Sequence, residues 1–469
     1  MKPTKSLWIA MSGIVLVMLL GLAISCAGGG GSAGTSPSSN SSQSSTVQVT
    51  MSDAPGDSIV SFSVSVDSIV LSKVSGGTVS LLSQPTRVEL THLAGTSTPI
   101  ATVDIPQDSY NQVAITVSSP QVTVVDPASG NTVTRTLQQT TVRTIALSPA
   151  LALGGTAVNL NLDLSVGDSV SVDSAGNITF NPRFLASHSP LQGASLPPRF
   201  EPLIGRVDSV SGTTFSLNVR FGQNIVRINT DNQTQFVGIS GIGSLTPGMM
   251  VSVIAAFSDG GQLLARKVIS LPAPANIGLE GLVKNTTGSP VTQFVLLAHN
   301  ATAGLPSSLA GREININVGA STVFLIDSDD FDLTKLPFTP VFTAASLNPG
   351  QAVEVHAPFP SVAVTDSTIS TTTLIASHIT LESQPAAGQV SAFTGGTTFT
   401  LLLPSDSALS RITGASSIQV FMQTGKTRLS GTVSGGSVTI TNGSRAIVRG
   451  LLFKDGGQFK MAATGVVVP

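Results

Sequence analysis

Two groups of aspartates have the residue type and the spacing to bind a cation. Asp53 and Asp57 lie four residues apart around a Pro-Gly turn, and a second group lies within six residues: Asp327, Asp329, Asp330 and Asp332. Ca²⁺ takes carboxylate oxygens as its ligands. For the first pair the alternative is a turn in which Asp53 accepts backbone N–H groups. For the second it is a solvated acidic loop, because the turn glycine and closing glutamate of an EF-hand are missing. Ca²⁺ is the one cofactor that the sequence suggests, and no metal site is assigned.

The histidines offer no catalytic pattern. None of the five stands in an H-x-x-x-H or H-x-E spacing: His92, His188, His299, His356 and His378. Those spacings matter because they place metal ligands, or a ligand and a base, on one element. A G-x-S-x-G nucleophile elbow and a P-loop are also missing. We therefore predict no catalytic residues and no enzyme. The alternative is a hydrolase acting on polysaccharide, which would need two carboxylates converging from distant parts of the chain.

Cys26 is the only cysteine, so an intramolecular disulfide is excluded. Lys2 and Lys5 precede an uncharged run over residues 9–24 that is rich in Leu, Ile, Val and Met. A basic start, an apolar stretch and small residues before a boundary are typical of a secretory signal. The run Leu22–Cys26 resembles a bacterial lipobox, and this resemblance implies cleavage before Cys26 and lipidation of its thiol. We expect residues 1–25 to be a signal peptide, with a signal-anchor helix as the alternative.

The segment after the cysteine has the composition of a tether. Residues 27–46 are Gly, Ser, Thr, Ala, Pro, Asn and Gln, with no charge and no large apolar side chain. Chains of this kind are flexible coils. We expect residues 26–46 to connect a lipid anchor to a folded body.

Composition excludes several classes of protein. Only 10% of the 469 residues are charged, the formal charge is −2, and the 23 basic residues form no cluster. Nucleic-acid binding is therefore not expected, because it needs a basic surface. At 41% hydrophobic residues the chain is too apolar for overall disorder. No long apolar run follows the N-terminus, which argues against a protein with many membrane helices.

Apolar and polar residues alternate strictly over residues 47–190. Val158 to Ser165, VNLNLDLS, is one example, and Ser61 to Asp67, SFSVSVD, is another. A period of two predicts strands buried on one face. Gly-, Pro- and Asn-rich turns separate these strands, and no amphipathic helix is evident. We predict an antiparallel β-sandwich for residues 47–190.

Five motifs in this region carry a family resemblance. They are Val47–Asp57 with its D-A-P turn, a strand ending in Val66–Ile69, Val88–Leu93, Asp108–Val113 and Asn177–Phe184. Together they resemble domain-of-unknown-function family 4382. Met51-Ser52 replaces the commoner Leu-Thr before Asp53. The resemblance implies a β-domain of bacterial envelope lipoproteins, and it implies no activity.

The second half of the chain contains three copies of one sequence pattern. The first echo is a strand start with glycine: Leu203–Val207, Leu279–Val283 and Ala387–Val390. The second is a turn before an apolar strand: Leu245–Val253, Leu347–Val355 and Thr441–Val448. The spacing is irregular, so we predict tandem small domains rather than a solenoid. Their expected bounds are 200–272, 276–383 with an insertion, and 386–469.

This repeated pattern resembles domain-of-unknown-function family 5666, with the first copy fitting best. The resemblance implies a small OB-like β-barrel for each repeat. The predicted fold is therefore all-β, with an N-terminal antiparallel β-sandwich followed by three small OB-like β-barrel repeats. A closed barrel also deals best with the edges of short strands.

These observations lead to one functional expectation and two alternatives. The expectation is a non-catalytic, lipid-anchored protein of the cell envelope with a binding or scaffold role, in the outer membrane if the organism is Gram-negative. Its partners would be the membrane, through the lipid, and an envelope protein or glycan; no small-molecule substrate is identified. The alternatives are a Ca²⁺- or glycan-binding surface module and, less favoured, the polysaccharide hydrolase.

Overall fold

The structure is a computed structural model of the 469-residue chain. It describes residues 43–54, 58–126, 129–173, 177–191, 200, 202–219, 224–258, 260–271, 277–301, 309–328, 331–358, 372–431, 433–434 and 437–468. Cys26, Asp57, Asp329 and Asp330 lie outside the described residues, as does the expected signal peptide. Among the described residues, no helix has the length and apolar character needed to cross a membrane.

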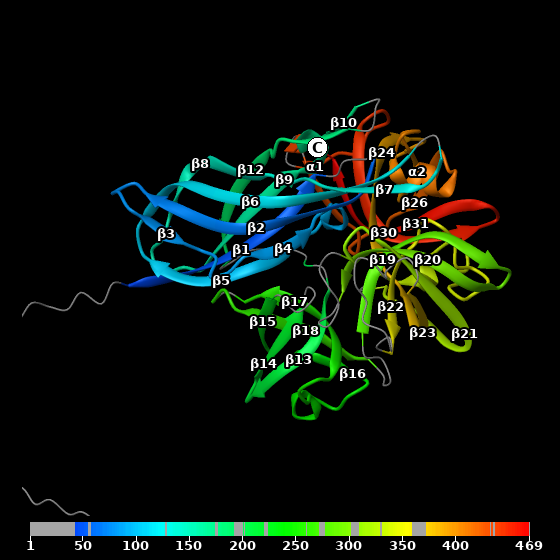
Figure 1. The fold of residues 1–469 in the computed structure, drawn as a ribbon, viewed down its shortest axis with the longest axis horizontal. Coiled ribbons are helices and arrows are strands. Elements are labelled where there is room, and N and C mark those ends of the chain that lie inside the picture. Colours follow the sequence, from blue (N-terminus) through cyan, green and yellow to red (C-terminus); the bar gives the residue numbers. More distant parts are fainter. Residues whose placement is uncertain are drawn as a thin grey trace, which may run out of the picture. The chain divides into compact units, whose positions relative to one another are not determined.

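The first sheet of the N-terminal domain has four strands in the order β12-β9-β1-β5 (Figure 1). Their bounds are β1 (Ser44–Ala54), β5 (Thr98–Pro106), β9 (Val158–Ser165) and β12 (Phe184–Pro190). β1 therefore begins within the segment expected to be a tether. It pairs antiparallel with β5 but parallel with β9, so the sheet is mixed rather than purely antiparallel.

The second sheet is built on two long antiparallel strands, β2 and β6, to which four further strands are added. The bounds are β2 (Ile59–Lys73), β3 (Thr78–Ser80), β4 (Thr86–Glu89), β6 (Ser109–Val125), β7 (Thr132–Thr136) and β8 (Thr140–Ala152). The alternating side chains Phe62, Val64 and Val66 are fully buried. They pack with Leu160 and Leu162 of the first sheet in one core, which is the predicted sandwich.

Short elements complete the sandwich, defined here as β1 to β12. They are η1 (Thr91–Leu93), α1 (Val166–Ser169), β10 (Val170–Val172) and β11 (Ile178–Phe180). η1 directly follows β4, and α1 directly follows β9. These two segments lead the chain out of the two sheets.

Three small barrels follow. Repeat 1 comprises β13 (Leu203–Ser211), β14 (Thr214–Val219), β15 (Asn224–Asn229), β16 (Gln235–Val237), β17 (Met250–Phe257) and β18 (Leu263–Ser270). Repeat 2 comprises β19 (Ile277–Gly288), β20 (Val291–Ala301), β21 (Glu313–Ile326), β22 (Ala352–Ala357) and β23 (Thr373–Leu381). Repeat 3 has as its main strands β24 (Ser383–Ser391), β25 (Thr398–Leu402), β26 (Ser417–Phe421), β30 (Arg445–Asp455) and β31 (Gln458–Val468). Smaller elements are η3 (Ile242–Ser244), η5 (Leu333–Lys335), α2 (Ala408–Thr413), β27 (Arg428–Gly431), β28 (Val433–Ser434) and β29 (Ser437–Val438).

The three repeats share one strand path. In each, the first strand pairs with the second and with the penultimate one, and the third pairs parallel with the last: β15 with β18, β21 with β23, and β26 with β31. These pairings close the circle of strands, and repeat 2 is a closed five-stranded barrel. The predicted all-β class, with a sandwich followed by small barrels, is confirmed.

Contact between strands explains the first sequence echo. A Cβ atom at Gly205, Gly281 or Gly388 would lie 2.4, 2.2 and 2.2 Å from a carbonyl oxygen of the second strand. No side chain fits at that distance, so each repeat requires glycine there.

The second echo forms a turn that contacts the first. Gly248, Gly350 and Gly443 each have φ of +88°, where glycine is favoured. Their N–H groups donate to the carbonyl oxygens of Val207, Val283 and Val390, at 2.8 Å in each copy. These valines stand two residues after the first-strand glycines. The two echoes are thus the two sides of one contact, which we call the turn clamp.

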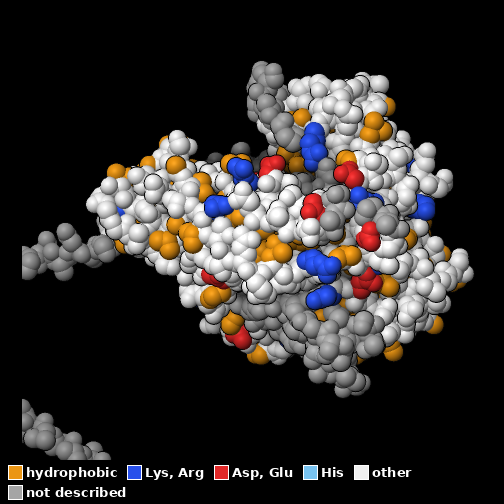
Figure 2. Space-filling view, turned by 45° about the horizontal axis from the view of Figure 1, so that its top comes forward, with side chains coloured by type: hydrophobic (Ala, Val, Ile, Leu, Met, Phe, Trp, Pro, Cys, Tyr) orange, Lys and Arg blue, Asp and Glu red, His pale blue; other side chains and the backbone are white. Residues whose placement is uncertain are grey.

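The surface is weakly charged. Figure 2 shows single basic and acidic side chains interspersed among uncharged polar groups on the face in view. Neither sign gathers into a large patch on that face.

Candidate functional site

Glu89 is buried where the second sandwich sheet ends. It is the last residue of β4, opposite Ser63 on β2. The apolar side chains of Val88, Leu90 and Leu93 on either side are all buried and fix the course of the chain into η1. This path carries a carboxylate, only 7% exposed, out of the regular strand and into the interior.

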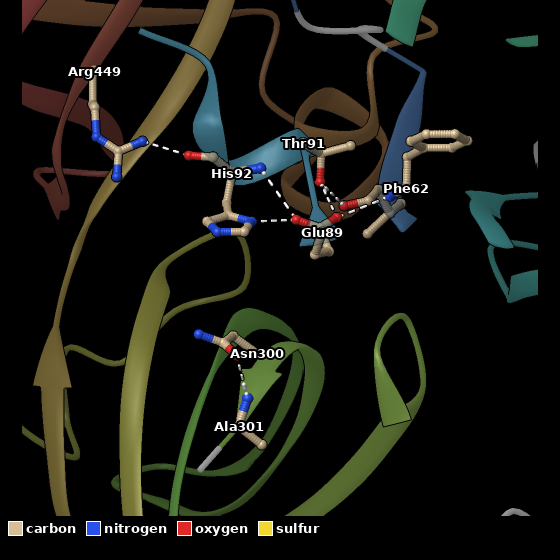
Figure 3. A network of polar contacts seen from close by, with 8 residues as sticks. Phe62, Glu89, Thr91, His92, Asn300, Ala301 and Arg449 are labelled. Atoms are coloured by element: carbon tan, nitrogen blue, oxygen red, sulfur yellow. Dashed lines mark hydrogen bonds and ion pairs between the residues drawn. The ribbon is translucent and has the colours of Figure 1, made fainter. Parts of the chain in front are cut away.

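The Glu89 carboxylate accepts hydrogen bonds on both oxygens (Figure 3). Oε1 accepts the backbone N–H of Phe62 at 2.9 Å and the hydroxyl of Thr91 at 2.6 Å. Oε2 contacts Nδ1 of His92 directly. A buried carboxylate needs such partners, because burying a charge without them is costly.

Two other segments meet this group. His299 lies on β20 of repeat 2, and its ring stacks on that of His92 with centroids 5.9 Å apart and an interplanar angle of 21°. Arg449, on β30 of repeat 3, donates to the backbone oxygen of His92 at 2.6 Å (Figure 3). Residues from the sandwich and from two repeats therefore converge around Glu89.

Electrostatics keep the Glu89 carboxylate ionised. Burial alone would raise its pKa, but His92 and His299 and the hydrogen bonds from His92 and Thr91 outweigh it and lower the pKa to about 2. Glu89 is therefore negative throughout the ordinary pH range.

The donor set of Glu89, His92 and His299 is that of a transition-metal site. One ligand atom from each lies within 4.8 Å of the other two. A carboxylate with two imidazoles suits Zn²⁺ and similar ions better than Ca²⁺. Spacing along the sequence does not reveal this group, because His299 is far from Glu89 and His92 in the chain. The nearest signal is the family motif Val88–Leu93, which contains two of the three residues.

A cavity of about 140 Å³ adjoins this group. Charged and titratable side chains from the sandwich and from repeats 2 and 3 line part of it: His92, Glu280, His299, Glu382 and Arg449. Much of the remaining lining is apolar, including Ile59, Val60 and Ile204. Pockets for drug-sized ligands have volumes of roughly 300–1,000 Å³. This cavity suits an ion with its water molecules rather than a sugar chain.

Asp53 is buried at the end of β1 and makes a hydrogen bond to another part of the sandwich. Its side chain is 5% exposed, and Oδ1 accepts the N–H of Val166 on α1 at 3.0 Å. Burial first, and then the carboxylates of Asp163 and Glu89, raise its pKa well above its ordinary value. Asp53 therefore accepts a backbone N–H, but from a distant element rather than from the Pro-Gly turn, which lies outside the described residues.

Of the second aspartate group, Asp327 and Asp332 are described. Asp332 caps η5, with Oδ1 accepting the N–H of Thr334 at 3.1 Å, and Oδ2 lies 3.5 Å from Nζ of Lys335. Asp327 donates its backbone N–H to Leu381 at 3.1 Å. Asp332 thus makes local contacts within its own loop, while Asp329 and Asp330 lie outside the described residues.

A larger hollow of about 860 Å³ lies between the sandwich and repeat 1. Hydroxyl and amide side chains predominate among its polar lining: Thr46, Ser80, Ser83, Gln84, Thr86, Thr102, Asn229 and Gln262. Asp104 is the one carboxylate among the described lining residues, and Arg227 is the one cation. No aromatic side chain lines it within the described part of the chain.

Comparison with known proteins supports the two family resemblances. The model of one domain of unknown function, DUF4382, matches residues 44–182, and that of another, DUF5666, matches residues 204–269. Both resemblances, and their order, are confirmed. No curated protein matches the chain. A solved structure titled "drosophila Unr CSD456" matches 57% of this chain and 97% of its own length, at 9% identity and a TM-score of 0.13. At that TM-score the match carries no argument about fold or function.

Proposed function

We propose that this chain is a non-catalytic protein of the bacterial cell envelope, held at a membrane by lipid on Cys26 and acting as a scaffold. The signal-like N-terminus and the lipobox resemblance support the location. The outer membrane is the proposed site if the organism has one. The partners would be envelope proteins or glycans.

The observation that carries the scaffold role is the joining of the sandwich to the repeats. Gln121 on β6 donates to the carbonyl of Ala310 in repeat 2 at 2.6 Å. Arg411 on α2 of repeat 3 donates to the carbonyl of Val125 at 2.8 Å. An apolar cluster joins β2, β6, β20 and α2: Val60, Val125, Leu297 and Ala408. These contacts connect the sandwich to repeats 2 and 3 through both hydrogen bonds and buried apolar side chains.

The cavities support a non-catalytic role. Glycoside hydrolysis requires a pair of carboxylates about 5–10 Å apart at a site that admits the sugar. The 860 Å³ hollow has room but only Asp104 among its described lining residues. The 140 Å³ cavity has Glu280 and Glu382 but is too small for a polysaccharide.

Two measurements test this proposal. The first is the mass of the N-terminal peptide after expression with the native signal and cell fractionation. For the wild type we expect an acylated Cys26 in the membrane fraction. For the Cys26→Ala variant we expect the protein in the soluble fraction. An unacylated, released wild-type chain would overturn the anchored role.

The second measurement is differential scanning calorimetry of the full chain in detergent. Because the domains share interior contacts, we expect one cooperative transition rather than one for each domain. Separate transitions at well-spaced temperatures would overturn the scaffold. The Arg411→Gln variant should begin to separate repeat 3 from the rest, whereas Arg143→Gln, which removes an arginine bonded within the sandwich, should not.

A second candidate function is glycan binding in the 860 Å³ hollow. Its hydroxyl and amide lining suits polar polymers, although it lacks the aromatic platform on which sugars stack. Co-sedimentation with purified peptidoglycan tests it, with Arg227→Ala as the variant and Arg135→Ala, outside the lining, as the control. Binding that is lost only in Arg227→Ala supports this candidate, and no binding by the wild type removes it.

A further inference from the structure

We propose that Glu89, His92 and His299 bind a divalent transition-metal ion of the zinc class, which ties repeat 2 to the sandwich. Two ligands come from the segment that joins β4 to η1, and the third comes from β20. The ligand atoms lie within 4.8 Å of one another. This inference goes beyond the scaffold role and does not depend on the lipid anchor.

The choice of ion follows from the donor atoms. Ca²⁺ and Mg²⁺ prefer sites made of oxygen ligands. Two imidazole nitrogens and one carboxylate oxygen are typical of Zn²⁺ sites and of related divalent ions such as Co²⁺. The calcium hypothesis for the aspartates therefore does not transfer to this site.

The surroundings of Glu89 hold one of its oxygens in place. Phe62 and Thr91 both donate to Oε1, while Oε2 faces His92. Hydrogen bonds that neighbouring residues donate to a metal ligand hold that ligand in orientation. Their loss commonly weakens metal affinity by about 10–100-fold. Oε2 is the oxygen left to bind the ion.

Ion entry requires local movement of the ligands, because their atoms lie up to 4.8 Å apart and must adjust to the spacing that one ion imposes. Nδ1 of His92 contacts Oε2 of Glu89 directly. Two ligands of one tetrahedral zinc ion are about 3.3 Å apart, given bonds of about 2.0–2.1 Å. The His92 ring must therefore move away from Glu89, and the adjoining 140 Å³ cavity provides space for this.

The same cavity can supply a fourth ligand. A water molecule occupies about 30 Å³ in the liquid, so the cavity has room for one beside the ion. Glu280 on β19 lines the cavity together with His92 and His299 and is the protein alternative to water. A Glu280→Gln variant distinguishes the two, since it weakens binding only if its carboxylate is a ligand.

The competing explanation is a buried ion pair that needs no metal. Both readings predict that substitutions at Glu89 or His92 destabilise the protein. Only the metal site predicts stoichiometric ion binding that depends on His299, and the test is built on that difference.

The test is isothermal titration of the EDTA-treated full chain in detergent with ZnCl₂ near neutral pH. We expect one ion per chain, and at least about 100-fold weaker binding in His92→Gln and His299→Gln. His188→Gln is the matched control, because His188 lies on β12 and contacts the carbonyl of Pro149. It should bind as the wild type does. Circular dichroism establishes that each variant is folded.

Titration with CoCl₂ provides a second measurement, visible absorption, which a buried ion pair without a metal would not produce. Bound Co²⁺ should give visible absorption in the wild type and in His188→Gln, and none in His299→Gln. Zn²⁺ should raise the melting temperature of the wild type but leave His299→Gln unchanged. The absence of saturable binding, or wild-type binding by a folded His299→Gln variant, would overturn the proposal. Either result would leave the lipid anchor and the calorimetric test unaffected.

Discussion

The junction of the sandwich with repeat 1 contains a buried apolar cluster, whereas the junction with repeat 2 combines a smaller apolar cluster with buried polar groups. Ala157 of the sandwich, together with Leu191 and Phe200 of the linker that follows β12, belongs to the same buried cluster as the core of repeat 1. Gln48 adds one amide contact to the carbonyl of Gly261. At repeat 2, by contrast, the contacts include the Glu89 network and hydrogen bonds to the carbonyls of residues 310 and 311.

This difference predicts different responses to conditions. Apolar burial has little directional requirement and depends little on pH. Buried charges and hydrogen bonds require defined partners, so protonation or the binding of an ion changes their free energy. We therefore expect the junction with repeat 1 to be permanent and the junction with repeat 2 to respond to its surroundings.

The largest effect should come from Phe200→Ala at the junction with repeat 1. Phe200 is 4% exposed and packs edge to face on Phe257, with ring centroids 4.5 Å apart. Truncating a buried phenylalanine costs about 3–5 kcal/mol. Urea unfolding should show this loss at pH 7 and at pH 4 alike. Phe200→Leu should retain most of the stability, and a strong pH dependence of the loss would contradict the apolar description.

At the junction with repeat 2, acid should remove the contribution of Glu89. Its pKa is about 2 in the folded chain against an ordinary 4.5, so folded Glu89 holds its proton less tightly. The stabilisation is present above pH 4.5 and is lost as the pH falls towards 2. It amounts to about 3 kcal/mol. Urea unfolding between pH 7 and pH 2.5 measures it.

Glu89→Gln should lack this dependence and be less stable at pH 7 by a similar amount. Glu313→Gln is the control, because that side chain is 38% exposed and is paired with Lys284 at 2.7 Å. It should cost about 1 kcal/mol or less. If the loss of stability at low pH persists unchanged in Glu89→Gln, another titratable group causes it.

Gly311→Ala should loosen the junction with repeat 2 by steric means. An added Cβ would lie 2.3 Å from Oγ1 of Thr123 on β6, and φ is +75°. Overpacking of this kind costs about 1–3 kcal/mol. Gly319→Ala is the control, with its nearest side-chain atom 3.9 Å away and no positive φ. Calorimetry of both variants should show a lower transition temperature for Gly311→Ala only. Equal transition temperatures would mean that this contact does not stabilise the junction.

The smallest effect, and the only stabilising one, is expected for Asp53→Asn. The folded chain holds the Asp53 proton more tightly than an unfolded chain does, so stability falls as pH rises above its ordinary pKa of 3.8. Asparagine removes that loss and keeps an oxygen for the N–H of Val166. A gain of up to about 1 kcal/mol at pH 7, absent at pH 3, is expected. Destabilisation at pH 7 would show that the charged carboxyl is needed.

The sequence predicted the class of fold because alternation states which face of a strand is buried. Val158–Ser165 forms β9 as its pattern indicates, and the repeated glycines mark the same contact in each barrel. The contacts between domains could not be predicted, since alternation does not say which domain covers a strand end. His299 is far from Glu89 along the chain, and only the fold brings the two together. The aspartates cluster in the sequence, yet in the structure Asp53 and Asp332 make hydrogen bonds to backbone N–H groups.

The turn clamp has a consequence for how this chain diversified. Its two sides come from the first strand and from the turn before the penultimate strand, and they meet in the same way in all three repeats. The stretch between them differs in length from copy to copy, and the long insertion of repeat 2 falls elsewhere than in the clamp. A repeat of this kind can accept or lose residues between the two sides while the barrel still closes. New surface loops can therefore arise in one repeat without a change in the others.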